Sequence, residues 1–111
     1  MSVALLAAVA AQPPFRVSAT SVVHLTSSSS GSTSTGSAVT TEGGKSPFTY
    51  SCVRIGGAPQ ISANTPTASS TTFAFSLPFE GFYVATFRWT VTDDDGLVAT
   101  TDVTVTVNYF I

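Results

Sequence analysis

Charge is what this chain of 111 residues has least of. Four Lys or Arg and six Asp or Glu make up only 9% of it, whereas about a quarter of the residues in an average soluble domain are charged. Ser and Thr take their place, with 16 and 18 residues. The four bases, Arg16, Lys45, Arg54 and Arg88, are scattered, and nucleic-acid binding requires clustered Lys or Arg. The sequence therefore argues against nucleic acid as a partner.

Cysteine and histidine are equally scarce, with one residue of each, Cys52 and His24. A single cysteine cannot form an intrachain disulfide, so we expect packing alone to hold the domain and Cys52 to behave as a small apolar side chain. A catalytic cysteine needs a histidine beside it, and His24 lies in another segment, where we expect it to be exposed or half-buried. No triad, carboxylate pair or metal-ligand spacing is discernible in the sequence. We therefore expect a protein that is not an enzyme and that uses no cofactor and no metal.

Long apolar runs are missing too. The longest, residues 3–11 (Val-Ala-Leu-Leu-Ala-Ala-Val-Ala-Ala), has under half of the roughly 20 residues that a membrane-spanning helix needs, so no membrane partner is expected. The run is similar to the apolar part of a secretory signal, but no Lys or Arg precedes it. We expect residues 1–14, which end at Pro13-Pro14, to form an apolar arm docked on the chain's own domain or on a neighbouring subunit.

Alternation of apolar and polar side chains dominates the chain from Phe15 onward. It is longest in residues 82–92 and 98–109, which the segment 93–96 (Asp-Asp-Asp-Gly) joins as a β-hairpin with a tight turn and one wet face. Shorter strands are expected at residues 37–41, 48–55 and 71–77, with another near Ile61, and the Ser-rich stretch 27–36 is typical of a flexible loop. About seven strands in residues 15–111 predict an all-β antiparallel sandwich of two packed sheets.

The expected first strand, residues 17–25, places every second side chain on one inward face: Val17, Ala19, Ser21, Val23 and Leu25.

The alternation also predicts which residues form the core and which lie at a contact surface. The core positions are Val39, Tyr50, Cys52, Phe73, Phe75, Tyr83, Phe87, Trp89, Val91, Val103 and Val105. Four of these aromatic residues, Phe73, Phe75, Phe87 and Trp89, would suit a sugar-stacking platform, but their inward positions favour core packing. Apolar residues at the two chain ends are expected to dock on a partner, because exposed apolar clusters mark interfaces: Val3, Leu5, Leu6, Val9, Phe15, Tyr109, Phe110 and Ile111.

The acidic segment Asp93-Asp94-Asp95 is the one constellation that suggests a metal. With Glu80 or Asp102 nearby it could offer oxygens to Ca²⁺, which takes six to eight of them. The spacing does not match an EF-hand loop, and Asp and Gly are also what a hairpin turn requires. We therefore expect a solvated turn without a metal.

Several motifs resemble the final hairpin of PKD and other bacterial-type immunoglobulin-like domains. They are Gly81-Phe82-Tyr83, Trp89-Thr90-Val91-Thr92-Asp93, Gly96-Leu97-Val98-Ala99 and Asp102-Val103-Thr104-Val105, preceded by Thr49-Tyr50-Ser51-Cys52-Val53-Arg54. The resemblance covers residues 15–107 and implies an immunoglobulin-like fold. The family commonly places a large aromatic residue on the third strand and a smaller one, often Cys, on the sixth, whereas here Cys52 comes first and Trp89 later. Because cores tolerate volume-conserving exchanges, we expect Cys52 and Trp89 to be neighbours.

With its Ser/Thr-rich first third, the chain looks like the immunoglobulin-like domains attached to tailed-phage virion proteins. This resemblance implies a structural or accessory protein of the virion, bound to the major capsid or tail protein and compatible with a homo-oligomer. Capsid decoration is favoured over a role in the tail. Two other hypotheses stay open: a carbohydrate-binding or adhesive module on a virion or bacterial surface, and a secreted bacterial surface protein.

Overall fold

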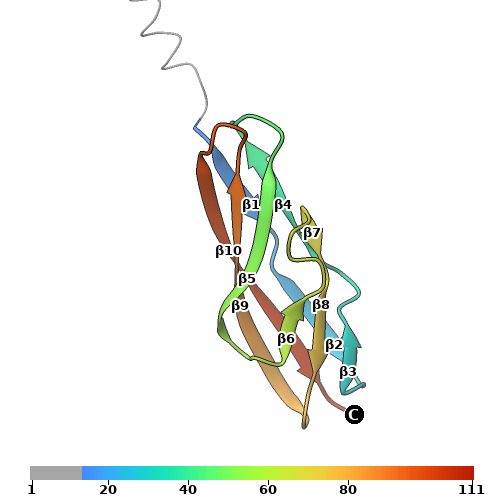
Figure 1. Cartoon of the computed structure of the whole chain (residues 1–111). Coiled ribbons are helices and arrows are strands. Elements are labelled where there is room, and N and C mark those ends of the chain that lie inside the picture. The colour runs from blue at the N-terminus through green and yellow to red at the C-terminus, as the bar shows by residue number, and fades with distance from the viewer. Residues whose placement is uncertain (1–13) are drawn as a thin grey trace, which may run out of the picture.

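The computed structural model describes residues 14–111, and these form an all-β structure that is compatible with a sandwich (Figure 1). The strands in chain order are β1 (Arg16–Ala19), β2 (Val22–Thr26), β3 (Ser30–Ser32), β4 (Ser37–Glu42), β5 (Thr49–Gly57), β6 (Ile61–Ala63), β7 (Ser70–Thr71), β8 (Phe73–Ser76), β9 (Gly81–Thr92) and β10 (Val98–Tyr109). The expectations for Val3, Leu5, Leu6 and Val9 lie outside the described residues.

The strands are hydrogen-bonded into three sheets. One has four strands in the order β2-β10-β9-β5, and the other two have three each, β1-β4-β7 and β3-β8-β6. All pairs are antiparallel except β2 with β10. The long hairpin β9–β10 is paired without interruption from Gly81 opposite Tyr109 to Thr92 opposite Val98. The other two strands of the four-stranded sheet pair with this hairpin, β2 with β10 and β5 with β9.

The first strand is divided between two sheets, which corrects one expectation. β1 pairs with β4, whereas β2, beginning after Thr20 and Ser21, pairs with β10 in the four-stranded sheet. Inner faces of two layers point toward each other, so a chain that changes layers must also change which alternate side chains face the core. Val22 is accordingly 2% exposed, while Val23 and Leu25, expected inside, are 68% and 75% exposed.

The Ser-rich stretch 27–36 is only partly a loop. It contains β3, which pairs with β8, and Thr33, which is buried. The backbone N–H of Thr33 donates to the carbonyl oxygen of Phe73 at 2.8 Å, and the N–H of Phe73 donates to Thr33 Oγ1 at 3.1 Å. These bonds tie the segment to the core strand β8, so the expectation of a flexible loop was wrong for residues 30–33.

The hydrophobic core consists of inward-facing side chains from both layers: Val22, Cys52, Ile61, Phe73, Phe75, Leu77, Tyr83, Ala85, Phe87, Trp89, Val103, Val105, Val107 and Tyr109. Val91 is also fully buried. Two of the expected core residues, Val39 and Tyr50, are half-buried and pack against this cluster.

Cys52 and Trp89 are direct cross-strand partners on β5 and β9, and both are buried in the core. They are therefore neighbours, as expected. They lie side by side in one sheet, as neighbours on adjacent strands.

Candidate interaction surface

An apolar patch covers one end of the outer face of the four-stranded sheet. We define it by Val23 and Leu25 of β2, Phe82 and Val84 of β9, and Phe110 just beyond β10, all of which are exposed. The strand pairing brings these residues together, because Asn108 is opposite both Leu25 and Phe82, and Thr106 is opposite both Val23 and Val84. The Phe110 ring packs edge-on against the Phe82 ring, with centroids 5.2 Å apart. The apolar residues of β2 and β9 thus flank Thr106 and Asn108 of the middle strand β10, and Phe110 lies beyond the end of β10.

Arg88 and Asp102, which lie on the same sheet face as the patch, neutralise each other. Arg88 and Asp102 are cross-strand partners, and the Arg88 Nε and Nη2 atoms donate to the two Asp102 carboxylate oxygens at 2.8 and 3.1 Å. This hydrogen-bonded pairing raises the pKa of Arg88 and lowers the pKa of Asp102. Both side chains are exposed, so the pair adds little stability, but it leaves the face without net charge.

The carboxyl-terminal residues extend the patch. The N–H of Phe110 donates to the carbonyl oxygen of Thr26 at 3.1 Å, and that of Ile111 donates to Glu80 Oε1 at 2.6 Å. A hollow of about 350 Å³ lies here, lined by Leu25, Thr26, Ser27, Asn108 and Phe110. Asn108 Oδ1 is buried and accepts no hydrogen bond from any described residue. The patch therefore contains one acceptor for which residues 14–111 provide no donor.

The described residues that were expected to dock on a partner differ in how exposed they are. Phe110 and Ile111 are exposed. Phe15 is half-buried and stacks on Phe48, with ring centroids 5.9 Å apart. Tyr109 is a correction: it is buried and belongs to the hydrophobic core, because it faces inward at the end of β10.

The sequence suggests Phe82, along with Phe48 and Phe79, as a candidate contributor to a contact surface, but sequence reasoning missed three residues of the patch, Val23, Leu25 and Val84. A signal for Val84 exists, since residues 82–85 (Phe-Tyr-Val-Ala) are apolar at both alternating positions. One face of such a strand fills the core, and the other must present apolar side chains to something else. For Val23 and Leu25, the unrecognised change of sheet reversed the assignment.

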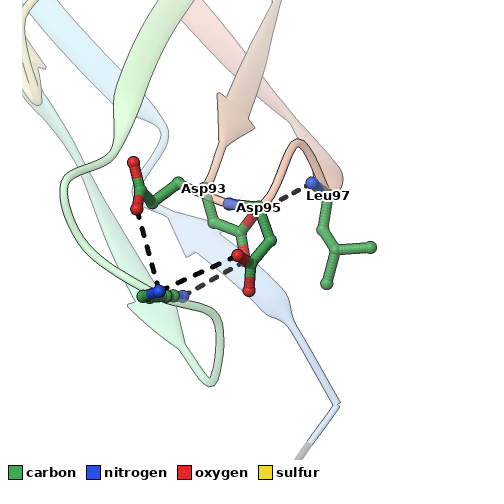
Figure 2. A network of polar contacts seen from close by, with 5 residues as sticks. Asp93, Asp95 and Leu97 are labelled. Atoms are coloured by element: carbon green, nitrogen blue, oxygen red, sulfur yellow. Dashed lines mark hydrogen bonds and ion pairs between the residues drawn. The ribbon is translucent and has the colours of Figure 1, made fainter.

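The acidic segment forms an ordered loop of five residues, 93–97, rather than a tight turn (Figure 2). Asp93 is 5% exposed. Its Oδ1 accepts from the N–H groups of Asp95 and Leu97 at 2.9 and 2.8 Å, and its Oδ2 accepts from that of Lys45 at 3.2 Å. Asp93 is thus committed to the backbone and is not solvated, which corrects the expectation for this residue.

The other two acidic residues of the loop, Asp94 and Asp95, are exposed. Each lies 3.9 Å from Lys45 Nζ. Among residues 14–111, no group of three or more His, Cys, Asp or Glu side chains is close enough to hold a metal ion.

The remaining candidate residues are engaged in packing. Burial raises the pKa of the Cys52 thiol to about 11, so it stays protonated near neutral pH and is a poor nucleophile. His24 is half-buried, lies 5.6 Å from the Phe75 ring, and its Nδ1 accepts a long bond of 3.5 Å from the Ser34 N–H. The four aromatic residues considered for sugar stacking, Phe73, Phe75, Phe87 and Trp89, are all buried. They cannot present their rings to a ligand.

What this surface offers chemically is apolar contact area, which a partner removes from water when it covers Leu25, Phe82 and Phe110. Residues 14–111 contain no helix long and apolar enough to cross a membrane. Comparison of the chain with protein-family models, with curated proteins and with solved structures finds no match.

Proposed function

We propose that this chain is a non-enzymatic structural or accessory protein of a tailed-phage virion, built on an immunoglobulin-like sandwich, and that it decorates the capsid. The observation that carries the proposal is the division of its strands between two layers. This division agrees with the family suggested by the motifs in residues 81–105.

The division becomes visible when interrupted strands are counted as one. We count β1 with β2, β3 with β4, and β7 with β8 as one interrupted strand each, which reduces the ten strands to seven. The first, second, fifth and fourth then share one layer through β1-β4-β7 and β3-β8-β6. The third, sixth and seventh share the other through β5-β9-β10, where the second half of the first strand, β2, also pairs with β10. This arrangement supports the proposal, because a constant-type immunoglobulin domain divides its seven strands in a similar way.

A side-chain contact at the start of β9 supports the same assignment. The hydroxyl group of Tyr83 donates to the carbonyl oxygen of Phe79, four residues upstream, at 2.6 Å. A tyrosine at the start of the sixth strand that bonds back to the preceding corner is a hallmark of immunoglobulin-like sandwiches. Tyr83 is also the tyrosine of the Gly81-Phe82-Tyr83 motif.

The surface supports a structural role. A neutral sheet face that ends in a patch of Phe, Leu and Val suits lasting burial against protein, because apolar area gains most from removal from water. The low charge of the whole chain provides little long-range steering of a charged ligand.

Mass spectrometry of gradient-purified particles tests the proposal. The chain is expected in many copies, at a fixed ratio to the major capsid protein. Separating heads from tails before the measurement distinguishes capsid decoration from a tail-associated role. Its absence from purified particles would overturn the proposal.

An adhesive or carbohydrate-binding module is the second candidate, favoured by the exposed rings of Phe79 and Phe82 at one end of the domain. Exposed aromatic faces can stack on sugars, whereas the buried ones of the core cannot. A glycan array decides this: binding that Phe82→Ala abolishes would support the adhesive role, and silence across the array would count against it.

A further inference from the structure

The apolar patch and the attachment point of residues 1–13 lie at opposite ends of the domain. Phe15 lines a hollow together with Gly43, Lys45, Asp93 and Leu97, which places the beginning of the described chain beside the β9–β10 loop. The patch surrounds the other end of this hairpin, near the carboxyl terminus (Figure 1). Asp93, which directly follows β9, is nine positions along the chain from Val84, a distance of about 30 Å at the rise of a strand.

This separation limits what residues 3–11 of the same chain can reach. A fully extended chain advances at most about 3.5 Å per residue. Counted from Pro14, Leu6 lies within about 28 Å and Leu5 within about 32 Å. Of the apolar run, only residues 3–5 could therefore touch the patch of their own domain, with the chain fully extended along the Thr-rich outer face. Most of the apolar run, residues 3–11, therefore cannot cover the patch of its own chain.

We propose that the patch of one copy receives residues 3–11 of a second copy, so that copies associate head to tail. The geometric limit does not apply between copies. The two surfaces match in chemistry, since residues 1–13 contain no Lys, Arg, Asp or Glu and none of the five patch side chains is charged. Contact between residues 3–11 and these five side chains therefore requires none of them to lose the hydration of a charge, and Glu80, which accepts from the Ile111 N–H, lies at the edge of the patch.

The contact joins two different surfaces, so each copy still has a free patch or a free arm after one contact has formed. Such head-to-tail contacts build rings when the rotation closes and open rows when it does not. This inference goes beyond the proposed function and holds whether or not the chain belongs to a virion.

Two variants of the full chain, each with one defective surface, test the inference. Leu25→Asp disables the patch at a position that is 75% exposed, so the fold is retained. The double change Leu5→Asp and Leu6→Asp disables the arm. Val98→Asp is the matched control, an exposed residue at the other end of the same sheet face. Circular dichroism and the melting temperature establish that all variants are folded.

Sedimentation velocity then gives the result. Wild type and the control are expected to associate with rising concentration, while each defective variant stays at the monomer mass of 11.4 kDa. An equimolar mixture of the two defective variants should recover one contact and sediment as a dimer of twice that mass. A monomeric wild type at all concentrations would overturn the inference. An equimolar mixture that stays monomeric would also overturn it. So would an arm variant that associates as wild type does, since that is the result of patch-to-patch contact. The measurement needs only the purified chain, so its failure leaves the proposed virion role untouched.

Discussion

The indole Nε1 of Trp89 donates a hydrogen bond to Ser37 Oγ, 3.1 Å away, in the centre of the core. Trp89 belongs to β9 in the four-stranded sheet and Ser37 to β4 in the sheet β1-β4-β7, so this bond joins the two layers. Both side chains are fully buried. The bond satisfies the buried hydroxyl group of Ser37 and the buried N–H of Trp89. It also links the two layers where the described residues contain no disulfide.

Replacing Ser37 therefore tests the link between the layers. Ser37→Ala leaves the Trp89 N–H buried without an acceptor, and we expect it to lower the free energy of unfolding by about 1 to 3 kcal/mol. Urea denaturation measures the change. In a double-mutant cycle with Trp89→Phe, the loss from Ser37→Ala should shrink, because no donor is then left unsatisfied. Equal losses in both backgrounds would show that the bond is not the cause.

The hydrogen bond of the Tyr83 hydroxyl group gives a second prediction. Tyr83→Phe removes the hydroxyl group that bonds to the Phe79 carbonyl oxygen but keeps the ring in the core. We expect a loss of about 1 kcal/mol in unfolding free energy, measured by urea denaturation. Tyr50→Phe is the matched control, since Tyr50 is only half-buried in β5. A larger loss of unfolding free energy for Tyr50→Phe than for Tyr83→Phe would contradict a stabilising role of the Tyr83 hydrogen bond.

The three aspartates of the 93–97 loop differ in environment, since Asp93 is buried and Asp94 and Asp95 are exposed. Asp93→Ala removes the acceptor of three backbone N–H groups, and we expect it to destabilise the domain by about 1 to 3 kcal/mol. Asp94→Ala and Asp95→Ala, which change exposed side chains, should stay within about 0.5 kcal/mol of wild type. Thermal unfolding of the three variants makes the comparison. Equal effects at all three positions would argue against the assignment to Asp93.

Calcium provides a separate check on the same loop. Both carboxylate oxygens of Asp93 already accept backbone hydrogen bonds, so they are not free to coordinate a cation. Addition of Ca²⁺, or of a chelator, should leave the melting temperature unchanged. A rise with Ca²⁺ that Asp93→Asn abolishes would refute this account of the loop.

Burial of Cys52 predicts a pH dependence. Because its pKa is raised from 9.0 to about 11 in the folded chain, the unfolded thiol loses its proton first as the pH rises. The contribution of Cys52 is thus fully present below about pH 9 and is lost as the pH rises toward 11. Stability measured across this interval should fall more steeply for wild type than for Cys52→Ala, which carries the same tyrosines and lysine. Identical slopes would exclude a buried thiol with a raised pKa.

Reactivity offers an independent readout of the same thiol. The thiolate is the reactive form, and at pH 8 a pKa near 11 rather than 9 lowers its fraction roughly 100-fold. Alkylation by iodoacetamide should accordingly be far slower in the native chain than in urea. Comparable rates in both states would place Cys52 at the surface.

The sequence reveals the β9–β10 hairpin because its twelve-residue strands alternate cleanly between core and solvent. It does not reveal β3, since Ser30, Gly31 and Ser32 pair through their backbones and carry no apolar signal. It misplaces Val23 and Leu25 because the switch between sheets at residues 20–21 depends on pairing with a strand some 80 residues away, as in Val105 with Val22. Such non-local pairing also assembles the patch, so its residues were individually visible but their proximity was not.

Add-back of the purified chain to particles that lack it tests the central claim most directly. If the chain is a structural virion protein, titration should give saturable binding, with a fixed number of copies per major capsid protein and co-sedimentation with the particle. A chain that remains at the top of the gradient at every concentration, next to intact particles, would contradict the account.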